Sequence, residues 1–411
     1  MWWNQKIKAK RISKPVKTPA KKFYISPKKN AKAAFFILAK WYINQSNRKM
    51  RIMCKHIDDI IRLFHKEKAT GYKIEEIRLE DDDSRWVLFV DFPKNQFVIK
   101  IAANDFTSKE RINGWVEIIN TYRSLGYYSP ALMKSRNNNY AEEIIFHSKP
   151  CVVWEEEFAK YHLCNSLDKS VYTDRDGRYV FQGDVLAFLG KVAEKHYDFF
   201  PYKSGWVRFE PFGANETTDE VTQCVKKFDM LVKEKAPQYI PRWEKIYSLF
   251  EENKKQLMQI YRTLPTSVFQ GDHFPGNLLL GEDGHLKGVI DYNLAGTDTV
   301  INVFLYTALF GYGYHYGSLQ VDESIMLSEY NSVAQDFMIQ SVWDTFKYLR
   351  QFYTFNEAEA KAVLPLYKYV SCIEYRQIEA FKKYQNDSQK LSLLFDTMES
   401  ELLREEKSEY F

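Results

Sequence analysis

Three side chains that could perform acid–base and metal-dependent chemistry lie close together in one segment of the sequence. Asp272 follows an apolar run, Asn277 comes five residues later, and Asp291 ends the next apolar run. A carboxylate can orient a hydroxyl group and remove its proton, and Asp and Asn oxygens are suitable ligands for Mg²⁺. Phosphoryl transfer needs both kinds of group in one place. We therefore predict that residues 269–293 form the catalytic centre.

The order of these residues resembles the catalytic loop of the aminoglycoside phosphotransferase and choline kinase superfamily. That loop reads approximately His-Gly-Asp-x-x-x-x-Asn and is followed by Ile-Asp, and this chain has Gln-Gly-Asp-His-Phe-Pro-Gly-Asn and then Ile-Asp. The resemblance is close over residues 269–298 and architectural over residues 55–400. It implies that Asp272 is the catalytic base, Asn277 a magnesium ligand and Asp291 the principal magnesium ligand.

Two further positions near this loop follow from the resemblance. Gln270 stands where the family usually has His. We expect its amide to organise the loop backbone, because an amide both donates and accepts hydrogen bonds. Asp298 matches a position that commonly braces the metal-binding loop of the family.

Candidate nucleotide-binding residues lie upstream. Lys100 interrupts the apolar run Phe-Val-Ile-Lys-Ile, and the resemblance implies that it is the third-strand lysine that contacts the α- and β-phosphates. Its partner would be a glutamate on the following helix, for which we favour Glu117 over Glu110. Glu156 and Phe158 are expected where the two lobes join, a segment whose backbone groups bind adenine in this family.

The loop between the first two predicted strands, residues 80–84, reads Glu-Asp-Asp-Asp-Ser and contains no glycine. Kinases often place glycine there, because backbone amides can then approach the phosphates closely. The four acidic side chains would repel a triphosphate unless magnesium or outward rotation relieves them. We expect Ser84 to donate a hydrogen bond in place of the glycine amides.

The apolar spacing predicts the elements that position these residues. A helix over 56–68 is followed by strands over 74–79, 86–92 and 96–102, a helix over 107–125 and strands over 142–147 and 151–155. Beyond residue 157 helical patterns dominate, interrupted by a hairpin over 277–290. We therefore predict an α+β, two-lobed protein-kinase-like fold. A small antiparallel N-lobe (51–157) would bind the nucleotide, and a larger helical C-lobe (158–411) would carry the catalytic and substrate sites.

Charge and cysteine usage exclude several other classes of protein. The first 50 residues carry 14 of the 58 Lys and Arg residues and no acid, which leaves 44 basic against 54 acidic residues, a net charge of −10. Such a body would repel nucleic-acid phosphates, and the basic segment 1–50 is predicted to be a disordered extension. The five cysteines lack zinc spacing, and no apolar run is long enough for a bilayer. We expect a cytoplasmic protein.

Together these features predict an enzyme that uses ATP and Mg²⁺ to phosphorylate a hydroxyl group of a small molecule. The acceptor could be aminoglycoside-like, choline-like or another metabolite, and the oligomeric state is open. The alternative is a catalytically silent kinase-like protein that binds a nucleotide or another ligand. The aromatic segment 311–317, Gly-Tyr-Gly-Tyr-His-Tyr-Gly, is predicted to be a helix-ending turn rather than a cage for a quaternary amine.

Overall fold

The computed structural model of this protein describes residues 52–53, 56–80, 83–175, 178–310 and 332–405. These residues belong to one compact unit, Ile52–Phe411. The predicted basic extension (1–50) and the aromatic segment 311–317 lie outside the described residues, as do Asp81 and Asp82 of the acidic loop. The lobe boundaries 51–157 and 158–411 stay a prediction.

The N-terminal part of this unit is built on a twisted sheet. Among the described residues, seven strands form it in the order β1-β6-β7-β4-β3-β2, with β5 paired to β7. All pairs are antiparallel except β1 with β6. The strands are β1 (Ile52–Met53), β2 (Gly71–Glu80), β3 (Asp83–Asp91), β4 (Gln96–Ala103), β5 (Leu132–Met133), β6 (Ala141–Phe146) and β7 (Lys149–Glu157).

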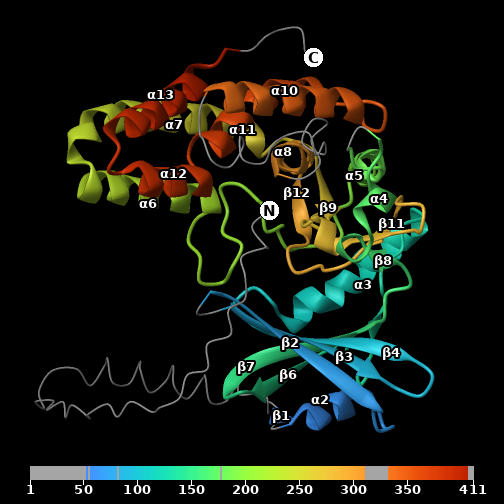
Figure 1. The fold of residues 1–411 in the computed structure, drawn as a ribbon. Helices are drawn as coiled ribbons and strands as arrows, with labels where there is room; N and C mark the ends of the chain where they lie inside the picture. The colour runs from blue at the N-terminus through green and yellow to red at the C-terminus, as the bar shows by residue number, and fades with distance from the viewer. Residues whose placement is uncertain (1–51, 54–55, 81–82, 176–177, 311–331, 406–411) are drawn as a thin grey trace, which may run out of the picture. The chain divides into compact units, whose positions relative to one another are not determined.

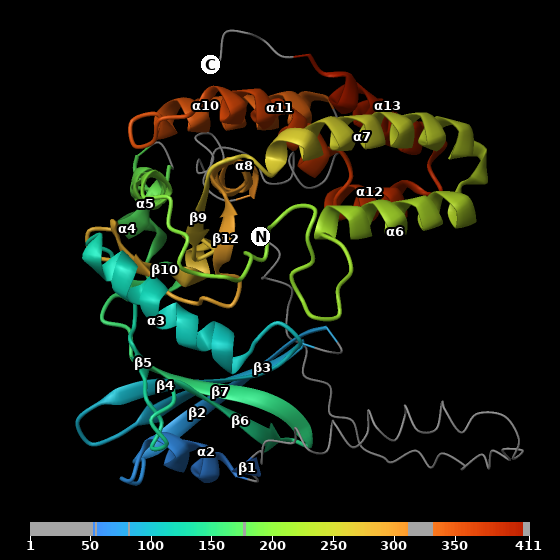
Figure 2. The ribbon, with the colours of Figure 1, turned by 180° about the vertical axis from the view of Figure 1, so that it is seen from behind.

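The two faces of the sheet have different partners. Helix α2 (Ile57–Phe64) covers one face, where its Ile60 and Ile61 share an apolar core with Trp86 and Leu88 of β3. On the other side of the sheet lies α3 (Lys109–Ser124), as Figures 1 and 2 show. Because successive side chains of a strand point to opposite faces, the strands β3, β4, β6 and β7 each contribute one residue set to the α2 core and the other set to the α3 side.

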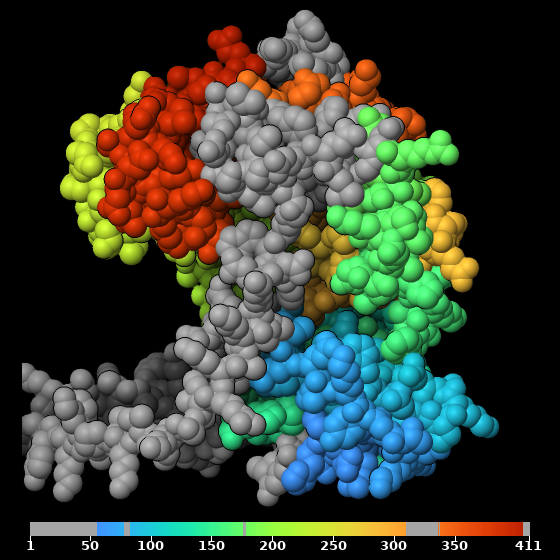
Figure 3. Space-filling view, viewed as in Figure 1, coloured from blue at the N-terminus to red at the C-terminus, as the bar shows by residue number. Residues whose placement is uncertain are grey.

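The C-terminal part is mainly helical. Its helices are α4 (Lys169–Tyr172), α5 (Gln182–Glu194), α6 (Glu220–Lys235), α7 (Ile240–Tyr261), α8 (Val300–Phe310), α10 (Ser332–Leu349), α11 (Glu357–Cys372), α12 (Tyr375–Tyr384) and α13 (Ser388–Leu403). Figure 3 shows the blue residues of the sheet and the red residues of the last helices at opposite ends of the unit. None of the helices in the described part of the chain has the length and apolar character needed to cross a bilayer. The predicted α+β class, a small antiparallel sheet followed by a larger helical part, is confirmed.

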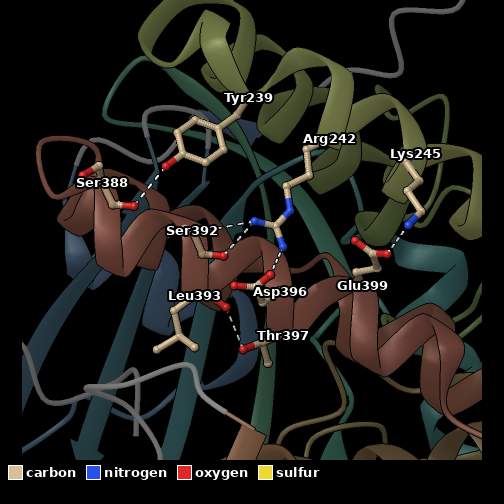
Figure 4. Close-up of polar contacts among 9 residues, drawn as sticks. All are labelled: Tyr239, Arg242, Lys245, Ser388, Ser392, Leu393, Asp396, Thr397 and Glu399. Atoms are coloured by element: carbon tan, nitrogen blue, oxygen red, sulfur yellow. Dashed lines mark hydrogen bonds and ion pairs between the residues drawn. The ribbon is translucent and has the colours of Figure 1, made fainter.

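Helix α13 is held against α7 by polar contacts as well as by apolar packing. Arg242 of α7 donates to Ser392 Oγ at 3.1 Å and forms an ion pair with Asp396, and Lys245 forms an ion pair with Glu399 (Figure 4). These pairs are exposed, so they contribute little free energy. They do fix the register of α13 on α7.

Four short strands carry the predicted catalytic segment. They are β9 (Thr266–Phe269), β10 (Leu278–Leu280), β11 (Leu286–Val289) and β12 (Gly296–Thr299). Strands β10 and β11 form an antiparallel hairpin that β8 (His162–Leu163) extends, and β12 pairs with β9. The hairpin was predicted from the sequence, whereas the β9–β12 pair was not, because strands of four residues carry too few alternations to be recognised.

The hairpin is joined to the segment that follows α3. Tyr128 N donates to Lys287 O at 2.8 Å, and Val289 N donates to Tyr128 O at 3.0 Å. This pairing brings the Tyr128 carbonyl so close to Gly288 that a Cβ atom there would lie 1.8 Å from it. Only glycine permits this backbone approach, so Gly288 maintains the contact between the two parts of the unit.

We expect Gly288→Ala to lower the free energy of unfolding by about 2–3 kcal/mol, because the methyl group would push the Tyr128 backbone off β11. Urea denaturation would measure this loss. Gly71→Ala is the matched control, since its Cβ would meet nothing closer than Asp91 Oδ2 at 3.6 Å. Equal stability of the two variants would contradict this account of the contact.

Candidate active site

One buried amide connects the two acidic segments of the candidate site. Gln270 directly follows β9, and its side chain is fully buried. Its Nε2 donates to the carbonyl of Ile290 at 2.8 Å and to the carbonyl of Asp291, while its Oε1 accepts from Asp272 N at 2.7 Å. The expectation that an amide can organise this loop in place of the usual histidine is confirmed.

The backbone on both sides of this amide adopts conformations that few residues tolerate. Gly271 has φ +87°, and a Cβ there would lie 2.3 Å from the carbonyl oxygen of Leu294. Asp291 has φ +64°, which is unfavourable for a residue with a Cβ. Strain of this kind persists only where surrounding contacts impose it, and it is concentrated at functional sites.

The carboxyl group of Asp272 is buried and only partly hydrogen-bonded. Asn277, at the end of a short 3₁₀ helix (Pro275–Asn277), donates from Nδ2 to Asp272 Oδ2 at 2.9 Å. Asp272 Oδ1 is buried and has no hydrogen-bond partner within the described part of the chain. Burial, and to a smaller extent the negative charge of Asp291, raises the pKa of Asp272 to about 7. A carboxylate with this pKa can accept a proton near neutral pH.

The oxygen atoms around this carboxyl group fit a magnesium ion. The Nδ2 group of Asn277 faces Asp272, which leaves its Oδ1 available, and the Asp291 carboxylate accepts a weak hydrogen bond of 3.3 Å from Asn293 N. Among the described residues, no group of three or more His, Cys, Asp or Glu assembles into a metal site. Mg²⁺ does not require one, because it commonly binds one or two protein oxygens together with phosphate and water.

Lys100 lies on the α3 side of the sheet and is charged. Its Nζ is 3.0 Å from Glu156 Oε1, and Trp154 Nε1 donates to the same oxygen at 2.9 Å. Burial by itself would lower the pKa of Lys100, but the negative charges of Glu156 and Asp291 outweigh it and raise the pKa above its ordinary value. The sheet therefore presents a fixed positive charge toward the segment that holds Asp291.

The predicted partner of Lys100 is wrong. Glu117 and Glu110 are both exposed on α3, and Glu156 of β7 pairs with Lys100 instead. The buried face of α3 is set by apolar residues at helical spacing, and Trp115 from that face packs edge-to-face on Trp154 with ring centroids 5.5 Å apart. Glu117, two residues after Trp115, points to another side of the helix.

The structure also corrects the role of Ser84. Its hydroxyl is buried and accepts a hydrogen bond from Lys149 Nζ at 2.9 Å. Ser84 shares the α2 face of β3 with Trp86 and Leu88, so it points away from Lys100. The residue on the opposite face is Arg85, which our sequence analysis missed. The alternation of apolar residues at 86, 88 and 90 is the signal that could have found it.

Two predicted residues remain, Phe158 and Asp298. Phe158 follows the end of β7 and is 44% exposed, so its placement near adenine stays a prediction. Asp298 is buried and accepts hydrogen bonds from Ser204 Oγ, Thr299 N and Asn302 Nδ2.

A second residue missed by the sequence analysis, Trp206, contacts the predicted catalytic loop. Its backbone N donates to Ser204 Oγ at 3.1 Å, and its Nε1 donates to the carbonyl of Gly271. Because Ser204 also donates to Asp298, a chain of hydrogen bonds runs from Asp298 to Gly271. Tryptophans are common core residues, so the sequence offers no signal for this contact.

We expect Glu156→Gln to lower the free energy of unfolding by about 2 kcal/mol or more, because Lys100 would keep a buried charge without its carboxylate partner. Chemical denaturation would measure the loss. Glu117→Gln is the matched control and should stay within about 0.5 kcal/mol of the parent protein, as is usual for exposed positions. The opposite ranking would restore Glu117 as the partner of Lys100.

The raised pKa of Asp272 predicts that this residue destabilises the fold. Between the ordinary pKa of Asp and about 7, the folded protein binds a proton more tightly than the unfolded chain, so this residue's contribution to stability falls as pH rises. We therefore expect Asp272→Asn, in EDTA at about pH 8, to melt about 5 °C or more above the parent protein. The gain should shrink toward about pH 5. A variant that melts below the parent at both pH values would contradict the prediction.

No protein-family model matches the sequence, and no curated protein matches it either. Solved structures similar to this chain are small-molecule kinases and antibiotic phosphotransferases. One is a microcompartment-associated aminopropanol kinase, with 11% identity, coverage of 84% of this chain and 94% of that chain, and a TM-score of 0.43. Another is an amicoumacin kinase, with 13% identity, coverage of 88% and 95%, and a TM-score of 0.44. At such low identities and TM-scores, the function has to follow from the residues of the site itself.

Proposed function

We propose that this protein is a magnesium-dependent phosphotransferase that moves the γ-phosphoryl group of ATP to a hydroxyl group of a small molecule. The observation that carries this proposal is the Asp272 carboxyl group, which has a pKa of about 7 and one buried oxygen without a partner among the described residues. Hydrogen bonds join it to Asn277 and, through Gln270, to the segment that carries Asp291. A general base and two metal-binding oxygens held close together are the groups that phosphoryl transfer requires.

In the proposed reaction, the acceptor hydroxyl donates a hydrogen bond to Asp272 Oδ1. The hydroxyl oxygen then attacks the γ-phosphorus as its proton passes to Asp272, and the bond from that phosphorus to the β,γ-bridging oxygen breaks to release ADP. Asn277 Nδ2 keeps Oδ2 of the base occupied at 2.9 Å, so Oδ1 is the atom that accepts the proton. Asn277 Oδ1 and the Asp291 carboxylate would hold Mg²⁺, which when bound neutralises phosphate charge.

Lys100, on the sheet, also supports the proposed phosphotransferase function. Its ammonium group is buried, protonated and oriented by Glu156. The electrostatic attraction between Lys100 and Asp291 is consistent with a place for the α- and β-phosphates between the sheet and the catalytic loop.

Aromatic side chains lie next to the loop that carries Asp272. Trp206 donates to the carbonyl of Gly271, the residue before Asp272, and its ring stacks on that of Tyr306 with centroids 4.1 Å apart. An aromatic surface beside the base suits an organic acceptor that has an apolar face. This supports a small-molecule acceptor, whether aminoglycoside-like, choline-like or another metabolite.

Two features of the sequence, Gln270 and the acidic loop 80–84, favour the alternative of a catalytically silent protein. The contacts of Gln270 and Asp83 in the structure weaken that argument. Gln270 makes the hydrogen bonds that hold the loop. Asp83 from the acidic loop is paired with Arg85 at 2.6 Å, which compensates its charge. We therefore favour an active enzyme over a silent nucleotide-binding protein.

The two aspartates should respond differently to substitution by asparagine. Asp291→Asn should weaken Mg²⁺-dependent ATP binding, because it removes the charged metal ligand. Asp272→Asn should keep ATP binding while phosphoryl transfer falls by about 10²- to 10⁴-fold, the usual scale for the loss of a general base. Calorimetry with ATP and Mg²⁺, together with transfer assays across aminoglycosides, choline, ethanolamine and sugar-like alcohols, would test both.

The parent protein must bind ATP for this comparison, and its failure to do so with or without Mg²⁺ would refute the proposed function. A loss of ATP binding in Asp272→Asn but not in Asp291→Asn would mean that the two roles are reversed. Unchanged binding and transfer in both variants would mean that this segment is not catalytic.

A further inference from the structure

Arg85 lies on the same face of the sheet as Lys100. In the β3–β4 ladder Val87 is opposite Lys100, and Arg85 is opposite Ala102. Residues two positions apart in a strand share a face, so Arg85 and Lys100 are diagonal neighbours, with Cα atoms separated by roughly 7–8 Å. Two cationic side chains therefore lie next to each other on one face of the sheet. The negative charge of Asp291 acts on Lys100, which is on this face.

The Arg85 guanidinium group is fixed before any ligand binds. Its Nε and Nη2 donate to the two carboxylate oxygens of Asp83 at 3.0 and 2.6 Å, and Asn104 Nδ2 donates to the same carboxylate at 3.1 Å. The group also lies over the Phe106 ring, 5.3 Å from its centroid. The side chain is only 16% exposed. Little conformational entropy remains for a ligand to remove from it.

One end of this guanidinium group is left for a ligand. Arg85 donates to Asp83 through its Nε–Nη2 edge. The remaining nitrogen, Nη1, makes no hydrogen bond within the described part of the chain. Arginine can bind one anion through one edge and a second anion, such as phosphate, through its end. The pair with Asp83 therefore orients the group without occupying all of its donors.

The neighbouring loop gives a reason for a cation at this position. Strands β2 and β3 stay paired as far as Glu80 opposite Asp83, and residues 80–84 contain no glycine. In kinases, glycine in this loop lets backbone amides approach the phosphates. Here the fixed arginine at the start of β3 can supply the hydrogen-bond donors instead.

We infer that Arg85 binds the phosphates of the nucleotide, as a second cation beside Lys100 that takes the place of glycine-loop amides. This inference rests on the proposed function, because it assumes that a nucleoside triphosphate enters the site. Asp83 would act as a positioning residue for Arg85, which gives the acidic loop a role in nucleotide binding.

Calorimetry with ATP, ADP and adenosine in the presence of Mg²⁺ would test the inference. Arg85→Gln should weaken ATP and ADP binding by about 10- to 100-fold, the usual effect of losing a charge-assisted hydrogen bond, and leave adenosine binding unchanged. Arg85→Lys should recover only part of the loss, since an ammonium group cannot bridge Asp83 and phosphate in the same way. Arg62→Gln on α2, 70% exposed beyond the opposite face of the sheet, is the matched control and should bind like the parent.

Each outcome separates the inference from the proposed function. Parent-like ATP and ADP binding by Arg85→Gln would overturn the inference and leave the proposed function intact, whereas a parent protein that binds no nucleotide would refute both. If Arg85→Gln fails to fold, the double variant Asp83→Asn/Arg85→Gln removes both charges of the buried pair and should show the same loss. Equal weakening of ATP, ADP and adenosine would also overturn the inference, because it would indicate a general change of the site.

Discussion

The geometry of the candidate site depends on the buried side chain of Gln270. Its amide accepts from the backbone of Asp272 and donates to the carbonyls of Ile290 and Asp291. A buried amide that uses both its donor and its acceptor in this way fixes two chain segments relative to each other. Asp272 and Asp291, the proposed base and the proposed metal ligand, come from different segments, so their relative position depends on this side chain. An apolar residue of similar size would leave the same backbone groups without partners.

Two features of the candidate site lower the stability of the folded protein. Asp272 has a pKa raised to about 7 and a buried oxygen with no partner in the part of the chain that the structure describes, and Asp291 has a left-handed backbone conformation. Such features are tolerated where the rest of the fold compensates for them. The compensation here comes from the strand pairs on both sides of the loop and from the hydrogen-bond chain between Asp298 and Gly271. The burial of Asp272, on which the proposed function depends, therefore opposes local stability in this segment.

The sheet organises its charges differently from the arrangement that the resemblance implies. Lys100 takes its partner from the neighbouring strand β7, which leaves α3 free to pack the apolar Trp115 against Trp154. The result is a rigid face on which a lysine and an arginine are each oriented by a carboxylate, Glu156 and Asp83 respectively. Strand residues are held more firmly than loop residues, which supports the proposal that this face positions phosphates without a glycine-rich loop.

The sequence alone determined the order of the main elements and the place of the predicted catalytic segment among them, because both depend on local information. Apolar periodicity located the main strands and α3, and the spacing of Asp272, Asn277 and Asp291 identified the loop that joins them. What the sequence could not determine is which side chains meet across elements. The partner of Lys100 depends on the rotation of α3 relative to the sheet, and the contact of Trp206 with Gly271 joins residues 65 positions apart. Whether Ser84 or Arg85 points to the Lys100 side of the sheet depends on which face of β3 packs against α2. A shift of one residue exchanges the two faces of a strand, and only the packed tertiary structure decides which face is buried.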